Sequence, residues 1–384
     1  MIYRFSWSIF ILIIILLNRD VFSSEQDVYR NALANLQAEY DSLKKTYSEE
    51  KLSLLNKQSF RGQTYEKRLN LRYQGIREAK KILLSRIEKN KETDLIKNET
   101  LYVVFLDPGH GGKDSGAIIP PLSLVEGDGY KLRESDITYS IARLVKQMLE
   151  KDKFIVILSR TRPSDGPSLY ARSALCRAIK PDIAISIHLN SSQYAFPVYD
   201  RPDTAIPEIN YTRVFVWQPS DLDLFYPFYK QIHEEIFSTD TRSKTLKLAR
   251  CLSDSFKMNL GLDYTVSPDM AMKLDAIKKL RARLSRPLTT TSTKKYTSED
   301  ISGEKLLENR LICNLYKKDI EHIPGVEGKD LHMVREAPSI PSVLVEPLFI
   351  SCPQEQVNIL ERNRKQEIAE AIAVAIREYF GLNE

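Results

Sequence analysis

Residues 102–112 read YVVFLDPGHGG, a β-branched and aromatic run that leads into a Pro-Gly turn and a histidine. An unbroken apolar run predicts a strand buried on both faces, as in a parallel or mixed sheet. His110 therefore lies just beyond the carboxyl end of a predicted strand, Tyr102–Leu106. In open α/β sheets that edge is where sites are assembled. The glycines around His110 allow the backbone bends and close approach that such a loop needs.

Two later segments have the same form. Residues 186–190 read SIHLN after the predicted strand Ile183–Ile187, and residues 343–346 read VLVE at the end of the strand Ser342–Val345. His188 and Glu346 are thus expected at the same sheet edge as His110. Two histidines and a carboxylate delivered to one edge are what a catalytic zinc site needs.

A catalytic zinc ion takes three protein ligands plus water, so a carboxylate should complete the pair of histidines. Glu134 fits best because it immediately precedes a predicted helix, and Glu126, in a glycine-containing loop, is the alternative ligand. Zinc lowers the pKa of water towards neutrality. A second carboxylate must then accept a proton and pass it to the leaving amine, and Glu346 is the candidate for that role. Asp107 either braces its turn or orients a ligand histidine.

The rest of the chain after residue 99 alternates strands with helices, which predicts the α/β class. The remaining strands are expected at Phe154–Leu158 and Arg213–Trp217, and the helices at Asp136–Leu149 (capped by Ser135), Leu169–Ile179, Leu246–Met258 and Glu355–Phe380. We expect a mostly parallel or mixed sheet of about six strands, flanked by helices on both faces. His233, His322 and His332 lie in polar surroundings and are expected to be exposed.

Residues 24–98 form a region of different composition, without proline, histidine or cysteine. Apolar residues recur there at helical spacing, which predicts two or more long, coiled-coil-like helices broken near Ser59–Gly62. Such a region serves as a spacer or docking surface rather than as a catalytic element. The catalytic domain is expected at 99–384, with an insert at about 263–328 that carries a basic helical piece and a polar run at Thr289–Lys295.

The first 23 residues have the form of a secretory signal peptide. Arg4 precedes the apolar run Ile9–Leu17, and Val21-Phe22-Ser23 offers a cleavage site. The alternative is an uncleaved signal anchor. Either reading predicts export, to the periplasm or cell envelope.

Composition is that of a globular protein of 384 residues, with 42% hydrophobic and 28% charged residues. The net charge of +5 comes without a long Lys/Arg block, so the sequence does not favour a nucleic-acid partner. The spacing of the four cysteines matches no zinc-knuckle or CxxC pattern, and their pairing stays open; they are Cys176, Cys251, Cys313 and Cys352.

From about Tyr102 to Phe380 the chain resembles the zinc-dependent N-acetylmuramoyl-L-alanine amidases known as amidase type 3. Five motifs in order carry the resemblance: FLDPGHGG at 105–112 with Asp114 and Gly116, RESDI at 133–137, LSR at 158–160, SIHLN at 186–190, and Arg335 with PSVLVE at 341–346. The chain departs from the family at Pro347–Phe349, where a glycine usually follows the catalytic Glu. The interval from His110 to Glu134 is also longer than usual.

The resemblance implies a peptidoglycan hydrolase that cleaves the amide between N-acetylmuramic acid and L-alanine. One zinc ion would be held by His110, Glu134 and His188, with Glu346 catalytic and with Asp107, Asn190 and Arg335 in support. A zinc peptidase acting on peptidoglycan peptides and a non-catalytic wall-binding scaffold are the alternatives. Some relatives carry a helix over the zinc, so the insert is expected to be autoinhibitory or substrate-positioning, with a solvated, disordered loop as the alternative. A protein activator would act on the insert or on the N-terminal helices.

Overall fold

The structure is a computed structural model. It describes residues 24–54, 60–89, 102–119, 131–152, 154–198, 201–220, 223–225, 227–284, 303–361 and 363–382. The predicted signal peptide, Glu126 and the polar run at 289–295 lie outside the described residues. Within the described part, no helix combines the length and the apolar character needed to span a bilayer.

A six-stranded mixed sheet forms the centre of the molecule, in the order β4-β1-β5-β8-β6-β7. The four strands β4, β1, β5 and β8 run parallel, β6 is antiparallel to β8, and β7 is parallel to β6. Their bounds are β1 Tyr102–Pro108, β4 Phe154–Leu158, β5 Ile183–Ile187, β6 Arg213–Trp217, β7 Val326–Lys329 and β8 Ser342–Glu346. The predicted α/β class and mixed sheet are confirmed.

Helices α4 (Glu134–Leu149), α7 (Thr241–Leu260) and α12 (Arg364–Phe380) cover one face of the sheet. Their apolar sides join the valines and isoleucines of that face in one buried cluster. Because these strands are buried on both faces, their sequences are almost wholly apolar, and this is why they could be predicted.

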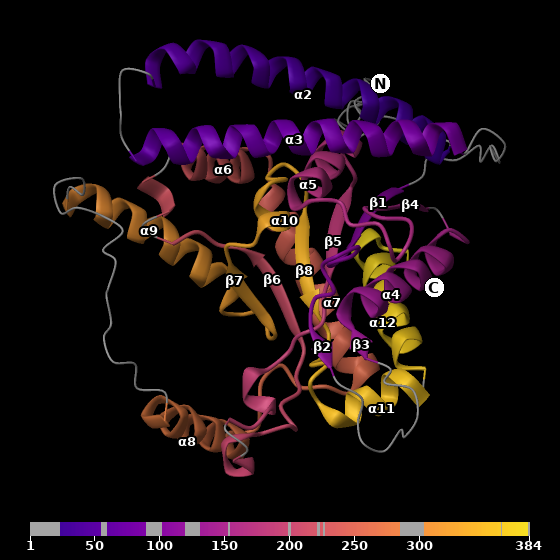
Figure 1. Ribbon diagram of the computed structural model, residues 1–384, viewed down its shortest axis with the longest axis vertical. Coiled ribbons are helices and arrows are strands. Elements are labelled where there is room, and N and C mark those ends of the chain that lie inside the picture. The colour runs from indigo at the N-terminus through magenta and orange to yellow at the C-terminus, as the bar shows by residue number, and fades with distance from the viewer. Residues whose placement is uncertain are drawn as a thin grey trace, which may run out of the picture.

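Helices α5 (Leu169–Ile179), α10 (His332–Arg335), α6 (Pro227–Ser238) and α9 (Gly303–Ile320) cover the opposite face. The N-terminal region forms two long helices, α2 (Glu25–Leu54) and α3 (Phe60–Lys89), which run side by side over α5 (Figure 1). Their buried residues share a cluster with Phe105 and Ile157 of the sheet. The two helices therefore pack against the α/β unit as a further layer.

Three local predictions are corrected. Helix α4 begins at Glu134, and Ser135 is not its cap, because loop carbonyls of Ala117 and Ser115 accept the first two helical N–H groups. The final helix is two helices, α11 (Pro353–Glu361) and α12. The predicted insert contains helix α8 (Pro268–Leu284), α9 and β7, so its last residues belong to the sheet.

Candidate metal centre

His110, Glu134 and His188 come together at the carboxyl edge of β1 and β5. One ligand atom from each lies within 4.8 Å of the other two. His110 Nε2 is 3.2 Å from Glu134 Oε2, and His188 Nδ1 is 3.1 Å from Glu134 Oε1. Two imidazoles and one carboxylate that face one another are a donor set suited to catalytic zinc.

Glu134 is held at the first turn of α4 by backbone groups on both sides. Its Oε2 accepts from the Ala117 N–H at 3.0 Å, and its Oε1 accepts from the Leu189 N–H at 3.0 Å. Burial by itself would raise the pKa of this carboxyl, but the hydrogen bonds with His110 and His188 outweigh it and hold the pKa well below its usual range. Glu134 is thus ionised, as a metal ligand must be.

The ring of His110 is oriented by Asp114. His110 adopts the left-handed backbone conformation, with φ of 59°, so the chain turns sharply and brings Asp114 back to the ring. His110 Nδ1 lies 2.9 Å from Asp114 Oδ2, which leaves Nε2 directed at Glu134. A carboxylate on the far nitrogen of a ligand histidine fixes the ring and raises its basicity.

Glycines make room for these rings. A Cβ at Gly116 would lie 2.6 Å from both Glu134 Oε2 and His110 Cδ2, and a Cβ at Gly109 would lie 2.4 Å from His188 Cε1. A side chain at either position would displace a ligand, and this steric conflict explains why both positions are glycine.

Glu346 ends β8, next to His188 in the sheet. The His188 N–H donates to the Val345 carbonyl at 2.9 Å, and Arg213 of β6 is the register partner of Glu346 on the other side. Burial raises the pKa of Glu346, while the positive charge of Arg213 opposes the rise. Glu327 of β7 holds that guanidinium, with Arg213 Nε 2.8 Å from Glu327 Oε1.

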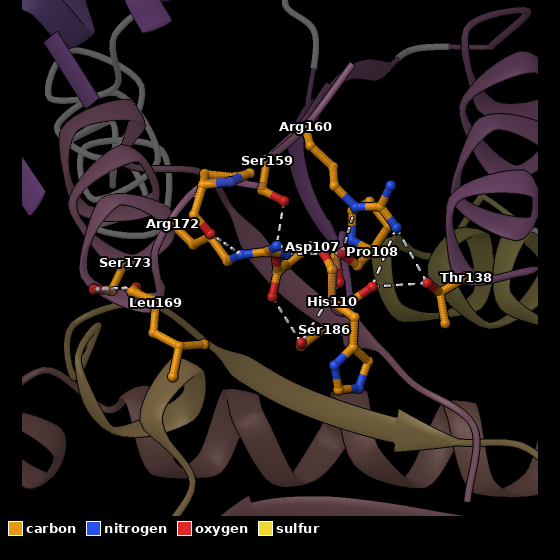
Figure 2. A network of polar contacts seen from close by, with 12 residues as sticks. Asp107, Pro108, His110, Thr138, Ser159, Arg160, Leu169, Arg172, Ser173 and Ser186 are labelled. Carbon is orange, nitrogen blue, oxygen red and sulfur yellow. Dashed lines mark hydrogen bonds and ion pairs between the residues drawn. The ribbon is translucent and has the colours of Figure 1, made fainter. Parts of the chain in front are cut away.

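Asp107 lies behind the metal cluster in a buried polar network (Figure 2). Its Oδ1 accepts from Ser159 Oγ at 2.6 Å and Arg172 Nη1 at 2.8 Å, and its Oδ2 accepts from Ser186 Oγ at 2.8 Å. Arg172 also donates to the carbonyls of Pro108 and His110. Asp107 is therefore a brace for the loop that carries His110, rather than a contact of the imidazole ring.

Arg160 ties the same loop to helix α4. Its guanidinium donates to the carbonyls of Pro108, Gly109 and Ser135, at 3.1, 3.1 and 2.6 Å. Ser135 follows Glu134 directly, so one buried side chain fixes the backbone next to two candidate ligands. The sequence motif at 158–160 contained this residue, but its spacing alone gave it no role.

The other two predicted supporting residues, Asn190 and Arg335, lie in different places. Asn190 joins the loops after β5 and β8, since its N–H donates to the Leu348 carbonyl and its carbonyl accepts from Ile350. The structure does not bring Arg335 to the metal cluster. Its guanidinium contacts Asp330, Tyr229 and Glu336 beside α10.

Of the three remaining histidines, which were expected to be exposed because their neighbours in the sequence are polar, only one is exposed. His322 is exposed as predicted, but His332 is partly buried, with its ring against Tyr170 and its Nε2 3.3 Å from Ser173 Oγ. Burial lowers the pKa of His332 to about 4. His233 is partly buried near Tyr316. All four cysteines are free thiols.

Asp114 and Arg213 are site residues to which sequence reasoning gave no role. Asp114 carried a signal, because a carboxylate four residues after a ligand histidine and within a glycine-rich turn can fold back onto the ring. Arg213 carried none, because it joins the site through pairing of β6 with β8.

Comparison with known proteins places this geometry in a family. A family model described as N-acetylmuramoyl-L-alanine amidase matches residues 104–378. The chain is 27% identical over 285 residues to the amidase AmiC of Escherichia coli O6:H1, covering 72% of this chain and 52% of the relative. It is 25% identical over 278 residues to AmiA of Escherichia coli K12, covering 72% and 76%.

The chain spans about half the length of the AmiC relatives that it matches. An amidase structure from Clostridium difficile 630 aligns with a TM-score of 0.43 and 17% identity, covering 74% of this chain and all of that one. The family model covers well over half of the chain, including all three candidate ligands and Glu346. The chain belongs to the N-acetylmuramoyl-L-alanine amidase family.

Proposed function

We propose that this protein is a zinc-dependent peptidoglycan hydrolase that cleaves the amide between N-acetylmuramic acid and the L-alanine of the stem peptide. The observation that carries the proposal is the His110–Glu134–His188 cluster at the sheet edge that also bears Glu346. A pure wall-binding scaffold has no need of a partly buried carboxylate beside such a cluster.

His110, Glu134 and His188 would hold one zinc ion, with Asp114 orienting the first of them. When bound, zinc supplies a Lewis acid for the amide carbonyl and lowers the pKa of water towards neutrality. The chain's own contribution is to keep Glu134 ionised and to hold all three ligands in line. Glu134 serves this most directly, because its pKa is held low and both of its oxygens are anchored by backbone N–H groups.

Glu346 would take a proton from the attacking water and deliver it to the leaving amine of L-alanine. Burial raises the pKa of this carboxyl, which brings it closer to working pH and makes it a better proton acceptor. Arg213 limits that rise, so the carboxylate form stays available for the first step.

Digestion of purified peptidoglycan tests the proposal. We expect release of intact stem peptides with free L-alanine amino termini, identified by mass, and loss of release when a chelator removes zinc. Cleavage within the stem peptide would instead support a zinc peptidase. Binding without any chelator-sensitive cleavage would support a scaffold.

Export to the periplasm or cell envelope follows from the signal-like first 23 residues and from the nature of the substrate.

We also propose that the insert regulates access to the site and that a protein activator acts on it or on α2 and α3. Helix α8 supports this, because it packs on the chain segments that follow His188 and Glu346: Ile277 shares a buried cluster with Ile206 and Phe349.

A further inference from the structure

Helix α3 of the N-terminal region reaches the polar network behind the metal cluster through Arg86. Arg86 is 8% exposed, and its Nη2 donates to the carbonyl of Ser159 at 3.0 Å. Its guanidinium carbon also lies 5.7 Å from the ring centre of Tyr29 on α2. Both N-terminal helices thus hold a cation against the carboxyl end of β4.

Ser159 is the point where this contact meets the site. Its hydroxyl donates to Asp107, and its neighbour Arg160 donates to the carbonyls of Pro108 and Gly109. The Ser159 N–H donates to the Leu106 carbonyl at 2.9 Å. Fixing the Ser159 carbonyl therefore restrains the side chains of Ser159 and Arg160, which hydrogen-bond to the segment that leads into His110 (Figure 2).

Packing alone does not explain an arginine at this place. In the described residues the guanidinium of Arg86 contacts the Ser159 carbonyl and Tyr29, and the Tyr29 hydroxyl in turn donates to Glu25. No direct ion pair with a carboxylate is seen among these contacts, and burying a cation without such a pair is costly. A long apolar side chain would fill the same volume between α3 and β4 without that cost. What the arginine adds is a directed hydrogen bond to one carbonyl.

We propose that Arg86 is a positioning residue for the metal centre, through which the N-terminal helices hold the His110 loop in its ligand geometry by way of Ser159, Asp107 and Arg160. This inference rests on the proposed zinc site. It gives residues 25–89 a part in forming the centre, beyond covering one face of the fold. It also means that any partner that lifts α3 would loosen the metal ligands.

The test compares full-length variants Arg86→Met, Arg86→Lys and Arg68→Met. Arg68 is the matched control, because it lies on the same helix and pairs with buried Glu336 but has no link to Ser159. Zinc affinity is measured by competition with a chromophoric chelator. We expect Arg86→Met to weaken zinc binding about tenfold, the lower range for outer partners of metal ligands. Arg86→Lys retains a donor and should recover most of the loss, while Arg68→Met should bind zinc like the wild type.

A second measurement needs no metal. Hydrogen exchange of residues 107–116 in the metal-free proteins should be at least about threefold faster in Arg86→Met than in Arg68→Met. Equal zinc affinity and equal exchange in these two variants would overturn the inference. A wild-type protein that binds no zinc would instead overturn the proposed function, and the exchange comparison would still decide the role of Arg86.

Discussion

The imidazole of His188 occupies the space beside the Cα of Gly109 where a side chain would begin. A Cβ at position 109 would lie 2.4 Å from His188 Cε1 and 2.6 Å from both ring nitrogens. Protein atoms do not pack at such distances, so one of the two residues must move if the glycine is replaced. The ring of His188 can therefore take its place in the metal cluster only because Gly109 has no side chain.

Substitution Gly109→Ala should weaken zinc binding by at least about tenfold, because the methyl group pushes a ligand ring out of place. Isothermal titration of the metal-free protein with zinc measures the change. Gly381→Ala is the control, since a Cβ there has no atom within 4 Å. Its left-handed backbone makes alanine cost about 1–2 kcal/mol of unfolding free energy. Unaltered zinc binding in Gly109→Ala would contradict the assignment of His188 as a ligand.

The features that the sequence predicted best are the bounds of strands that are buried along most of their length. Strands β4, β5 and β6 have the predicted bounds because each is a mostly apolar run that is buried along nearly its whole length. Strand β7 was missed because it reads VEGK, a short and half-polar edge strand without a β signal of its own. It pairs only because β6 offers a free edge.

Contacts that hydrophobic periodicity does not reveal explain the other differences. Helix α4 needs no side-chain cap because a loop from residues 115–117 satisfies its first N–H groups. The break between α11 and α12 is bridged by Arg364, which folds back to pair with Glu355 at 2.8 Å. His332 is partly covered by residues of α5, far away in the sequence. None of these partners is visible in local sequence.

Glu346→Gln should retain zinc and lose catalysis. The amide has nearly the same shape as the carboxylate but cannot accept the proton, so we expect kcat to fall by about 10²–10⁴. Turnover of purified peptidoglycan and zinc content are measured on the same sample. Activity within a few-fold of wild type would remove Glu346 from the mechanism.

Arg213→Met should shift the acid limb of the pH–rate profile to higher pH. The reaction needs ionised Glu346, so activity falls as pH drops through the pKa of that carboxyl. Burial raises this pKa and Arg213 opposes the rise. Removing the cation therefore raises the pKa further, and the half-maximal point of kcat/KM moves upward. Arg30→Met removes an exposed cation from α2 and should leave the profile unchanged; an equal profile in Arg213→Met would refute the electrostatic role.

Asp107→Asn should destabilise the fold by about 3–5 kcal/mol at neutral pH, because Arg172 is left buried without its counter-charge. Burial alone would raise the pKa of Asp107, but Arg172 and Ser159 outweigh it and lower the pKa. A lowered pKa means that the ionised group stabilises the fold above its unfolded value of about 3.9 and that this is lost as pH falls through the folded value. In urea unfolding, the free energy of unfolding of the wild type should thus exceed that of the variant by the full amount at pH 7 and by less at acid pH. If this difference does not change with pH, the charge of Asp107 is not what stabilises the loop.

Ile277→Asp tests regulation by the insert without removing β7, which a deletion of the whole insert would do. Ile277 is 9% exposed and seats α8 in the cluster with Ile206 and Phe349, while Arg281 donates to the carbonyls of Gln193 and Thr204. A buried aspartate there should release α8 from the segments that follow His188 and Glu346. If α8 restricts access to the site, basal peptidoglycan hydrolysis rises in this variant. Met272→Asp, at a 66% exposed position of the same helix, should leave hydrolysis unchanged. A folded Ile277→Asp protein with lower hydrolysis would instead assign α8 to positioning the substrate.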